Sequence, residues 1–205
     1  MLSIKNATIK TRQPILANFN FEFQSHKIYG LIAPNGSGKT TFFRSVMQLI
    51  PLVKGEYIID DLPASKQQQK IFYFETSSWF DDNLSGWDYL LFIKQTWGSS
   101  LDVNNLIQDW QMADYIKLPI KKYSLGMKQR LLIGLYEISD AKYLLMDEIT
   151  NGLDLNNRDK LFSKIKQLKD KNKMIIISSH YKEDLESICD YELFLENNTM
   201  AVKKV

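Results

Sequence analysis

The sequence predicts an α/β protein with a mainly parallel sheet, and three observations indicate this class. Short apolar segments typical of strands alternate with segments of helical spacing, an order that favours a parallel sheet covered by helices. A glycine-rich loop joins one apolar strand to one helix near position 36. The chain has 205 residues, of which 44% are hydrophobic, and this suits a single folded domain with a substantial core.

The regular elements are expected in a simple alternating order. Phe19, Phe21 and Phe23 alternate with polar residues, and this period of two predicts a strand with one buried face. Pro51 marks the end of the helix that follows the glycine loop, and residues 54–55 are expected to form a turn. The expected strands are two over residues 2–29 and one each over 28–33, 57–59, 143–147 and 174–177, and the expected helices cover 40–50, 131–138 and 158–169.

Residues 77–123 differ in character from the rest of the chain. All four tryptophans lie in this stretch, on segments with helical spacing, which predicts a helical insertion into the α/β body. These residues are Trp79, Trp87, Trp97 and Trp110.

Composition excludes several classes of function. Lysine and arginine together number 26 against 24 acidic residues, so the net charge of +2 gives no electrostatic basis for dedicated nucleic-acid binding. Cys189 is the single cysteine, which excludes an internal disulfide framework and a cysteine-built metal site, and only His26 and His180 remain for zinc. No apolar run approaches the roughly 18 residues of a membrane-spanning helix, and residues 1–30 lack a signal-peptide pattern, so we expect a soluble cytosolic protein.

The glycine-rich loop has the pattern of a phosphate-binding loop, or P-loop. Residues 36–40 read Gly-Ser-Gly-Lys-Thr and stand between a strand and a helix. Glycines let backbone N–H groups curl around phosphate oxygens, and the helix N-terminus adds the positive end of its dipole. In such a loop Lys39 reaches the β- and γ-phosphates, while the hydroxyl of Thr40 holds Mg²⁺.

An acidic pair ends the apolar strand expected over residues 143–147. Asp147 and Glu148 stand about 110 residues after the P-loop. An apolar strand that delivers an acidic residue beside a P-loop can position Mg²⁺ through water, and the adjacent carboxylate can polarise the attacking water. The pair alone is weak support, because a strand leaving the core can also end in two acidic residues.

A third motif carries a resemblance to a known family. Residues 123–130, Tyr-Ser-Leu-Gly-Met-Lys-Gln-Arg, closely resemble the signature motif of the ATP-binding-cassette (ABC) ATPases, in the variant common among bacterial exporter-type systems, and lie about 20 residues before Asp147. Residues 150–154 resemble the D-loop of that family, and residues 178–180 resemble its switch histidine at a strand end. Because four motifs occur in the family's order, the resemblance is specific and covers nearly the whole chain.

The resemblance implies a P-loop NTPase fold with a mainly parallel sheet, an antiparallel β portion and a helical subdomain. Residues 1–205 would form a single ABC ATPase domain, with the helical subdomain inserted at about 77–130. It also implies a sandwich dimer that binds two nucleotides at its interface, with ATP and Mg²⁺ as the cofactors.

The resemblance also implies a role for each motif residue. Ser124 and Gly126 of one subunit would contact the γ-phosphate held by the P-loop of the other, and Asp154 would link the two sites. Glu148 would act as general base or orient the attacking water, and His180 would contact the γ-phosphate. The implied catalytic residues are Lys39, Ser124, Gly126, Glu148 and His180; the nucleotide-binding residues are Asn35, Gly36, Ser37, Gly38, Lys39, Thr40 and Thr41; the metal-binding residues are Thr40 and Asp147.

Four positions depart from the family pattern. Ala33 stands where the usual P-loop has glycine, which a negative φ would allow, and Ile149 replaces the proline after the catalytic glutamate. The family usually offers an adenine-stacking aromatic near position 11, but residues 10–12 contain none. The Q-loop glutamine expected near position 76 is absent, although Glu75 or Thr76 could offer oxygen to Mg²⁺. Hydrolysis is still expected, because no phosphate, metal or base group is lost.

The function implied is that of an ATP-hydrolysing subunit that powers a bacterial-type transporter, expected to be an exporter. The implied partners are a separate membrane-spanning permease and a second, identical ATP-binding subunit, with no nucleic acid. The chain would then be cytoplasmic and peripheral on the inner face of the membrane.

Two questions stay open at this level. The aromatic residues between 79 and 97 can pack a helical core or line a docking groove for the permease. A soluble ABC ATPase without a transport role is the alternative function. The signature motif argues against an unrelated P-loop kinase or GTPase.

Overall fold

A six-stranded sheet forms the centre of the fold. In the computed structural model, which describes residues 1–179 and 182–205, its strand order is β10-β9-β3-β8-β7-β6. Strands β9, β3, β8, β7 and β6 are parallel, and β10 pairs antiparallel with β9 at one edge. The strands are β3 (Lys27–Ile32), β6 (Ile71–Tyr73), β7 (Tyr143–Met146), β8 (Met174–Ser178), β9 (Tyr191–Glu196) and β10 (Thr199–Lys204). The parallel arrangement brings the carboxyl ends of β3, β6, β7 and β8 to one edge, where ligands bind in open α/β sheets.

A second, antiparallel sheet has the order β2-β1-β4-β5. Its strands are β1 (Leu2–Lys10), β2 (Pro14–Phe23), β4 (Lys54–Ile59) and β5 (Leu62–Pro63). Phe19 and Phe23 on β2 are buried and Phe21 packs against the same core, which confirms the buried strand face expected there. The two sheets together confirm the predicted fold class of a mainly parallel sheet with an antiparallel β portion.

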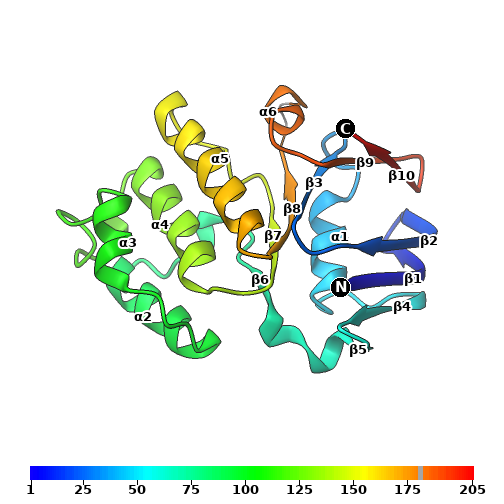
Figure 1. Cartoon of the computed structure of the whole chain (residues 1–205), viewed down its shortest axis with the longest axis horizontal. Coiled ribbons are helices and arrows are strands. Elements are labelled where there is room, and N and C mark those ends of the chain that lie inside the picture. The colour runs from blue at the N-terminus through cyan, green and yellow to red at the C-terminus, as the bar shows by residue number, and fades with distance from the viewer. Residues whose placement is uncertain (180–181) are drawn as a thin grey trace.

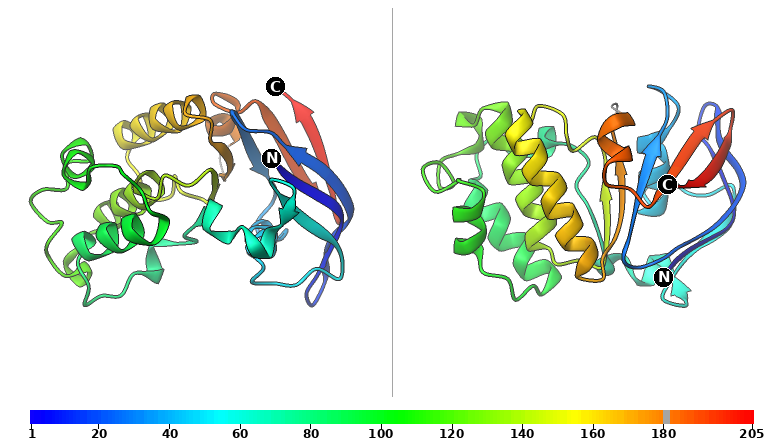
Figure 2. Two further views of the ribbon diagram at one scale, coloured as in Figure 1. Left: turned by 60° about the horizontal axis from the view of Figure 1, so that its bottom comes forward. Right: turned by 45° about the horizontal axis from the view of Figure 1, so that its top comes forward.

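Helices cover both faces of the six-stranded sheet. Ser85 and Asp88 form a capping box at the start of α2, and Gly98 ends that helix in the left-handed conformation. Figure 2 shows α2, α3 and α4 as one group on the side away from the antiparallel sheet, the position of the expected helical subdomain. The helices are α1 (Lys39–Val46), α2 (Gly86–Trp97), α3 (Val103–Asp109), α4 (Leu125–Ile138), α5 (Leu155–Asp170) and α6 (Lys182–Glu186), with short 3-10 turns η1 (Ala64–Lys66), η2 (Gln68–Lys70), η3 (Ser77–Trp79) and η4 (Ile120–Lys122).

The six-stranded sheet separates two hydrophobic cores. Helix α1 lies between the two sheets (Figure 1), and its Phe42 and Phe43 are fully buried there. On the opposite face Leu144 of β7 packs in one core with Leu131 of α4 and Ile165 of α5. Burial of apolar surface on both faces fixes the strand ends relative to α1, and these strand ends carry the motif residues.

Several element boundaries differ from those expected. Helix α1 ends at Val46 instead of residue 50, because Gln48 adopts a positive φ of 61°. Residues 54–55 belong to β4 instead of a turn, and Gly55 has a φ of 93° inside the strand. Helix α4 begins at Leu125, six residues before the expected start, because the signature motif itself forms its first turn. Strands β5, β6, β9 and β10 were not expected.

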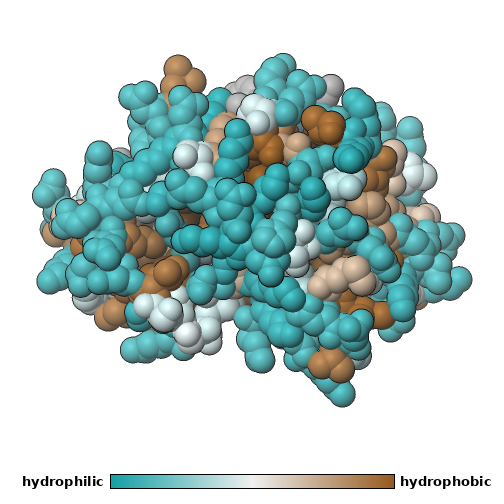
Figure 3. Space-filling model, in the orientation of Figure 1, coloured by the Kyte–Doolittle hydropathy of each residue, from teal (hydrophilic) through white to brown (hydrophobic). Residues whose placement is uncertain are grey.

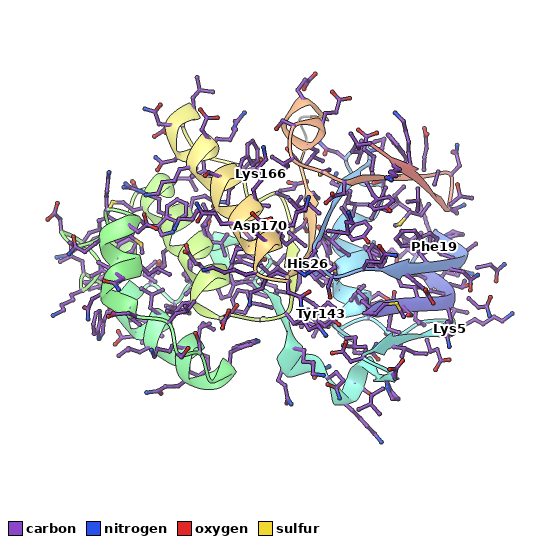
Figure 4. All side chains as sticks on the ribbon, viewed as in Figure 1. Lys5, Phe19, His26, Tyr143, Lys166 and Asp170 are labelled. Atoms are coloured by element: carbon purple, nitrogen blue, oxygen red, sulfur yellow. The ribbon has the colours of Figure 1, made fainter. Side chains whose placement is uncertain are left out.

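The exposed surface is mixed in character. Figure 3 shows a face that is mainly hydrophilic, with separate hydrophobic patches between the hydrophilic residues. His26 lies beside the C-terminal end of α5 (Figure 4), where its Nδ1 is 3.1 Å from the carbonyl oxygen of Lys169. This contact gives His26 a structural partner. Within the described part of the chain, no helix combines the length and apolar character needed to cross a membrane.

Candidate nucleotide and metal site

The glycine-rich loop connects β3 to α1 and depends on two left-handed glycines. Gly36 has a φ of 76° and Gly38 a φ of 106°, conformations that L side chains rarely adopt. A Cβ built at Gly38 would lie 2.4 Å from Cγ2 of Ile15, so this position also lacks space for a side chain. Ala33 is not among the residues with positive φ, so alanine fits where the family pattern has glycine.

Lys39 begins α1 and places its ammonium group against the loop. Its Nζ donates hydrogen bonds to the carbonyl oxygens of Ala33 at 3.0 Å and Pro34 at 3.3 Å, and lies 3.6 Å from Oε1 of Glu148. Only 5% of Lys39 is exposed. A hollow beside this group is lined by Asn35, Gly36, Gly38, Lys39, Thr40, Thr41 and Glu148. The structure therefore brings six of the seven expected nucleotide-binding residues to one surface, with a cation among them; Ser37 lies in the same loop but outside this hollow.

Thr40 and Asp147 meet directly, although they come from different parts of the chain. The hydroxyl of Thr40 donates a hydrogen bond to Oδ2 of Asp147 at 2.6 Å, and the hydroxyl of Ser178 donates one to Oδ1 at 2.6 Å. Burial raises the pKa of Asp147, while the Ser178 and Thr40 hydrogen bonds act in the opposite direction. A hydroxyl and a carboxylate side by side are oxygen donors of the kind that Mg²⁺ prefers. This pair therefore fits the expected metal.

The described residues contain no group of three His, Cys, Asp or Glu side chains able to hold a metal ion by themselves. A metal at Thr40 and Asp147 would therefore depend on water and phosphate oxygens for its remaining ligands, as is common for Mg²⁺.

Glu148 follows Asp147 with an unusual backbone conformation. Its φ is 49°, and its N–H donates a hydrogen bond to the hydroxyl of Ser178 at 2.9 Å. Nδ2 of Asn151 donates to Oε2 at 3.1 Å, and the side chain remains 29% exposed. The carboxylate thus lies between the Lys39 ammonium and solvent, where a general base for water would have to be.

A cavity of about 310 Å³ lies between the acidic pair and α4, the helix whose first turn contains the signature motif and which we call the signature helix. Thr40, Asp147 and Glu148 line it on one side, and Leu125 and Gln129 of α4 line it on the other. Gln129 is buried, and its Nε2 donates to the carbonyl oxygen of Ile149 at 2.5 Å. A hydrogen bond therefore joins the signature helix to the segment that follows the acidic pair in the same chain.

Ser124 and Gly126 lie apart from the P-loop of their own chain. Ser124 caps α4, with its hydroxyl accepting a hydrogen bond from the Met127 N–H at 3.3 Å, and is exposed. A Cβ at Gly126 would meet nothing within 4 Å. Neither residue lines the hollow at Lys39 or the cavity beside it. Of the five expected catalytic residues, the structure brings together Lys39 and Glu148.

His180 and Asp154 are two further residues for which the resemblance implies a role. His180 lies outside the described residues. Asp154 caps α5, where its carboxylate accepts a hydrogen bond from the Asn157 N–H at 2.8 Å, and this bond lowers its pKa.

Two functional candidates were missed by the sequence analysis. Ser178 bridges the carboxylate of Asp147 and the N–H of Glu148; it stands in the 178–180 segment that resembles the family's switch, but no role of its own was expected for it. Arg44 donates two hydrogen bonds of 2.6 Å to the two carboxylate oxygens of Glu75, and the hydroxyl of Tyr73 donates to the same group at 3.0 Å. Glu75 is therefore held by protein groups, which makes it a poor direct Mg²⁺ ligand.

Comparisons with known proteins identify the same family that the motifs resemble. The family model described as ABC transporter matches residues 16–151. The chain is 31% identical over 207 residues to a lantibiotic transport ATP-binding protein, SrtF, from Streptococcus pyogenes, covering 100% of this chain and 90% of that protein. It is 31% identical over 211 residues to the uncharacterized ABC transporter ATP-binding protein YybJ of Bacillus subtilis, covering 100% of this chain and 96% of that one.

Solved structures agree on the fold. An ATP-binding subunit of an ABC transporter superposes with a TM-score of 0.90 at 20% identity, covering 100% of this chain and 90% of that one. A putative ABC transporter ATP-binding protein from Pyrococcus furiosus gives a TM-score of 0.81 at 22% identity, covering 95% and 96% of the two chains. The P-loop, the acidic pair and the signature helix thus occur in the fold and the sequence family expected of them, and the chain belongs to the ABC transporter family as an ATP-binding subunit that hydrolyses ATP.

Proposed function

We propose that this subunit powers the export of a substrate through a separate membrane-spanning permease, by ATP-driven closure of two ATP-binding subunits. The observation that carries the proposal is the geometry of the motifs. Lys39, Thr40, Asp147 and Glu148 lie together and would form one half of a nucleotide site, while the exposed Ser124 and the partly exposed Gly126 lie outside that group in the same chain. Two copies arranged head to tail would complete two sites, and an identical second copy is the simplest partner.

The roles within one site follow from the contacts. Backbone N–H groups of the P-loop and the Lys39 ammonium would bind phosphate oxygens, and Thr41 lies at the same helix N-terminus. Thr40 and Asp147 would hold Mg²⁺, which when bound supplies positive charge that offsets the charge of the transferred phosphoryl group. Glu148 would accept a proton from the attacking water or orient it, because its carboxylate lies beside Lys39 and remains partly exposed.

The signature helix would complete the site of the partner copy. Ser124 is exposed at the N-terminus of α4, where its hydroxyl, the first backbone N–H groups and the positive end of the helix dipole would together bind an anion. Leu125 and Leu155 are 61% and 75% exposed, and a Cβ at Gly152 would lie 2.8 Å from Leu125, so the turn at Gly152 lies beside the start of α4. Burial of these leucines against a second copy would stabilise the closed dimer.

Export is supported by the names of relatives. Besides the lantibiotic transport protein, a linearmycin resistance ATP-binding protein of Bacillus subtilis is 28% identical over 189 residues, covering 87% of this chain and 60% of that protein. The first name gives transport of a lantibiotic, and the second gives resistance to linearmycin. The permease would keep the subunit at the cytoplasmic face of the membrane, and residues 1–205 would act as one ABC ATPase domain with residues 77–130 as its helical subdomain.

Co-purification tests the transport role. The tagged full chain, extracted from its native cells in detergent, should carry a hydrophobic polypeptide identifiable by mass spectrometry, and the complex should hydrolyse ATP. A chain that copurifies only with ribosomes or soluble assemblies, at native expression level, would support a soluble ABC ATPase and contradict the proposal.

A further inference from the structure

Arg44 and Glu75 form an ion pair next to the metal site, and no motif of the family accounts for it. Arg44 lies one turn after Thr40 on α1, so the two side chains share a face of that helix. Glu75 follows β6, and Asp147 follows β7, the neighbouring parallel strand. Helix α1 is therefore joined to two adjacent strand ends, by Thr40 to Asp147 and by Arg44 to Glu75.

The pair is well placed to act on the cavity at the metal site. Glu75 is only 13% exposed and lines the cavity that also contains Thr40, Asp147 and Glu148. Three carboxylates, those of Glu75, Asp147 and Glu148, thus border one cavity. Arg44 compensates part of this negative charge at Glu75, as Lys39 does at Glu148, and the pKa of Arg44 is raised first of all by the hydrogen bonds to Glu75.

The geometry shows how Glu75 is held. Two parallel N–H···O bonds from a guanidinium fix both oxygens of a carboxylate, and Lys cannot reproduce this fork. The Tyr73 hydroxyl donates a third hydrogen bond to Oε2. With these donors in place Glu75 contributes negative charge to the cavity without turning an oxygen toward a metal.

We propose that Glu75 and Arg44 are positioning residues that set the electrostatic potential at the Mg²⁺ site, Glu75 strengthening and Arg44 weakening the attraction for the cation. The two charges act through space on a metal held by Thr40 and Asp147. The inference rests on the proposed function, because it requires Mg²⁺ to bind with nucleotide at that place.

The consequence is a pair of effects with opposite sign. Removing the Glu75 charge leaves the Arg44 cation uncompensated beside the metal and weakens Mg²⁺ binding. Removing the Arg44 charge leaves the Glu75 carboxylate uncompensated and free of its fork, so Mg²⁺ binding becomes tighter. A double substitution restores the net charge of the wild type. A purely structural role for the pair predicts something else, because both single changes would loosen α1 and weaken binding together.

The experiment measures the Mg²⁺ concentration that half-saturates binding of a fluorescent ATP analogue to the full chain, without turnover. Glu75→Gln should raise that concentration about threefold to tenfold, and Arg44→Gln should lower it by a similar factor. The double variant should lie within about twofold of wild type. Both shifts should shrink as salt increases, because part of the pair is exposed to solvent.

Two further variants keep the test decisive. Arg44→Lys keeps the charge but loses the fork, and should stay within about twofold of wild type if charge is what matters. Lys27→Gln removes a cation from a pair with Asp190 that lies away from the site, and should change nothing. Single variants that both weaken Mg²⁺ binding, or that both leave it unchanged, would overturn the inference. A wild-type chain that binds no nucleotide at any Mg²⁺ concentration would instead overturn the proposed function.

Discussion

Thr40 and Asp147 stand 107 positions apart in the chain, yet the hydroxyl of the first donates a hydrogen bond to the carboxylate of the second at 2.6 Å. This contact joins the start of α1 to the end of β7. Ser178, at the end of β8, donates to the other oxygen of the same carboxylate. Three segments that are distant in sequence therefore meet at a single buried side chain, and the position of that side chain depends on all of them.

Ser178→Ala should lower both stability and activity. The substitution removes one donor to Asp147 and leaves the N–H of Glu148 without its acceptor, so the free energy of unfolding should fall by about 1–3 kcal/mol. Urea unfolding of the full chain measures this change. Thr96→Ala is the matched control, because its exposed hydroxyl bonds the Phe92 carbonyl of its own helix and no other group among the described residues, and it should change stability by less than about 0.5 kcal/mol. Equal effects of the two variants would contradict the bridging role.

Glu148→Gln should abolish most ATP turnover while ATP binding stays intact. The change keeps the size of the side chain and removes the base. The closed, ATP-bound dimer should then accumulate, visible as a shift in size-exclusion chromatography with ATP and Mg²⁺. Turnover within a factor of about two of the wild type would rule out Glu148 as the group that prepares the water.

Ser124→Arg should separate binding from closure. The bulky side chain projects from an exposed helix start that lies away from the P-loop of the same chain, so ATP binding to the monomer should be nearly unchanged. Closure should be blocked, because the arginine would occupy the space of the γ-phosphate contact in the partner. Mixing Ser124→Arg subunits with Glu148→Gln subunits tests whether each nucleotide site combines residues of two subunits. Normal hydrolysis by Ser124→Arg in the assembled complex would contradict the cross-subunit role.

Patterns along the chain predicted the segments whose own residues form the candidate nucleotide site. The glycine loop, the acidic pair and the signature motif are each contiguous in sequence, so the first two could be located from their residues and the third from its resemblance to the family motif. Strand β6 is three residues long and β9 carries a buried glutamate, Glu192, so neither shows the periodicity of a strand. Their positions come from pairing with β7 and β3, which is tertiary information.

Dependence on tertiary contacts also explains why the sequence did not reveal the roles of Ser178 and Arg44. Ser178 and Arg44 act through partners that are distant in sequence, since Asp147 lies 31 positions from Ser178 and Glu75 lies 31 positions from Arg44. An arginine on a helix and a serine at a strand end are common on any surface. Their roles follow from the register of parallel strands and the placement of α1 between two sheets, and no local pattern encodes either.

Trp79→Ala and Phe80→Ala should act differently, although the two residues are neighbours. Phe80 is 6% exposed and stacks on Phe74, so its truncation should cost about 3–5 kcal/mol of stability. Trp79 is 46% exposed and should cost much less, but its loss should weaken association with the permease if it lines the docking groove. Thermal unfolding of the isolated chain and pull-down of the permease measure the two effects. Trp79→Ala that destabilises the chain without a selective loss of permease binding would favour core packing instead.

The final prediction concerns the base of the nucleotide. A hollow beside the P-loop is bordered by Gln13, Pro14 and Ile15, by Gly36 and Ser37, and by the turn at residues 195–198. None of these described residues is aromatic, so a stacking contribution of about 1–3 kcal/mol per base, the scale known from nucleic-acid sites, is missing. Affinity should then rest mainly on phosphate contacts, which are the same for adenine and guanine.

We therefore expect ATP and GTP to bind within about tenfold of each other, a difference of about 1.4 kcal/mol. Competition binding with both nucleotides, on the isolated chain and on the assembled transporter, measures the ratio. Thr11→Tyr should tighten binding of both nucleotides, because it supplies a ring near the position where the family usually has one. Thr11→Leu is the control for added apolar area without a stacking ring, and should have the smaller effect. A preference for ATP above about a hundredfold would mean that another group reads the base, and Thr11→Tyr would then add little.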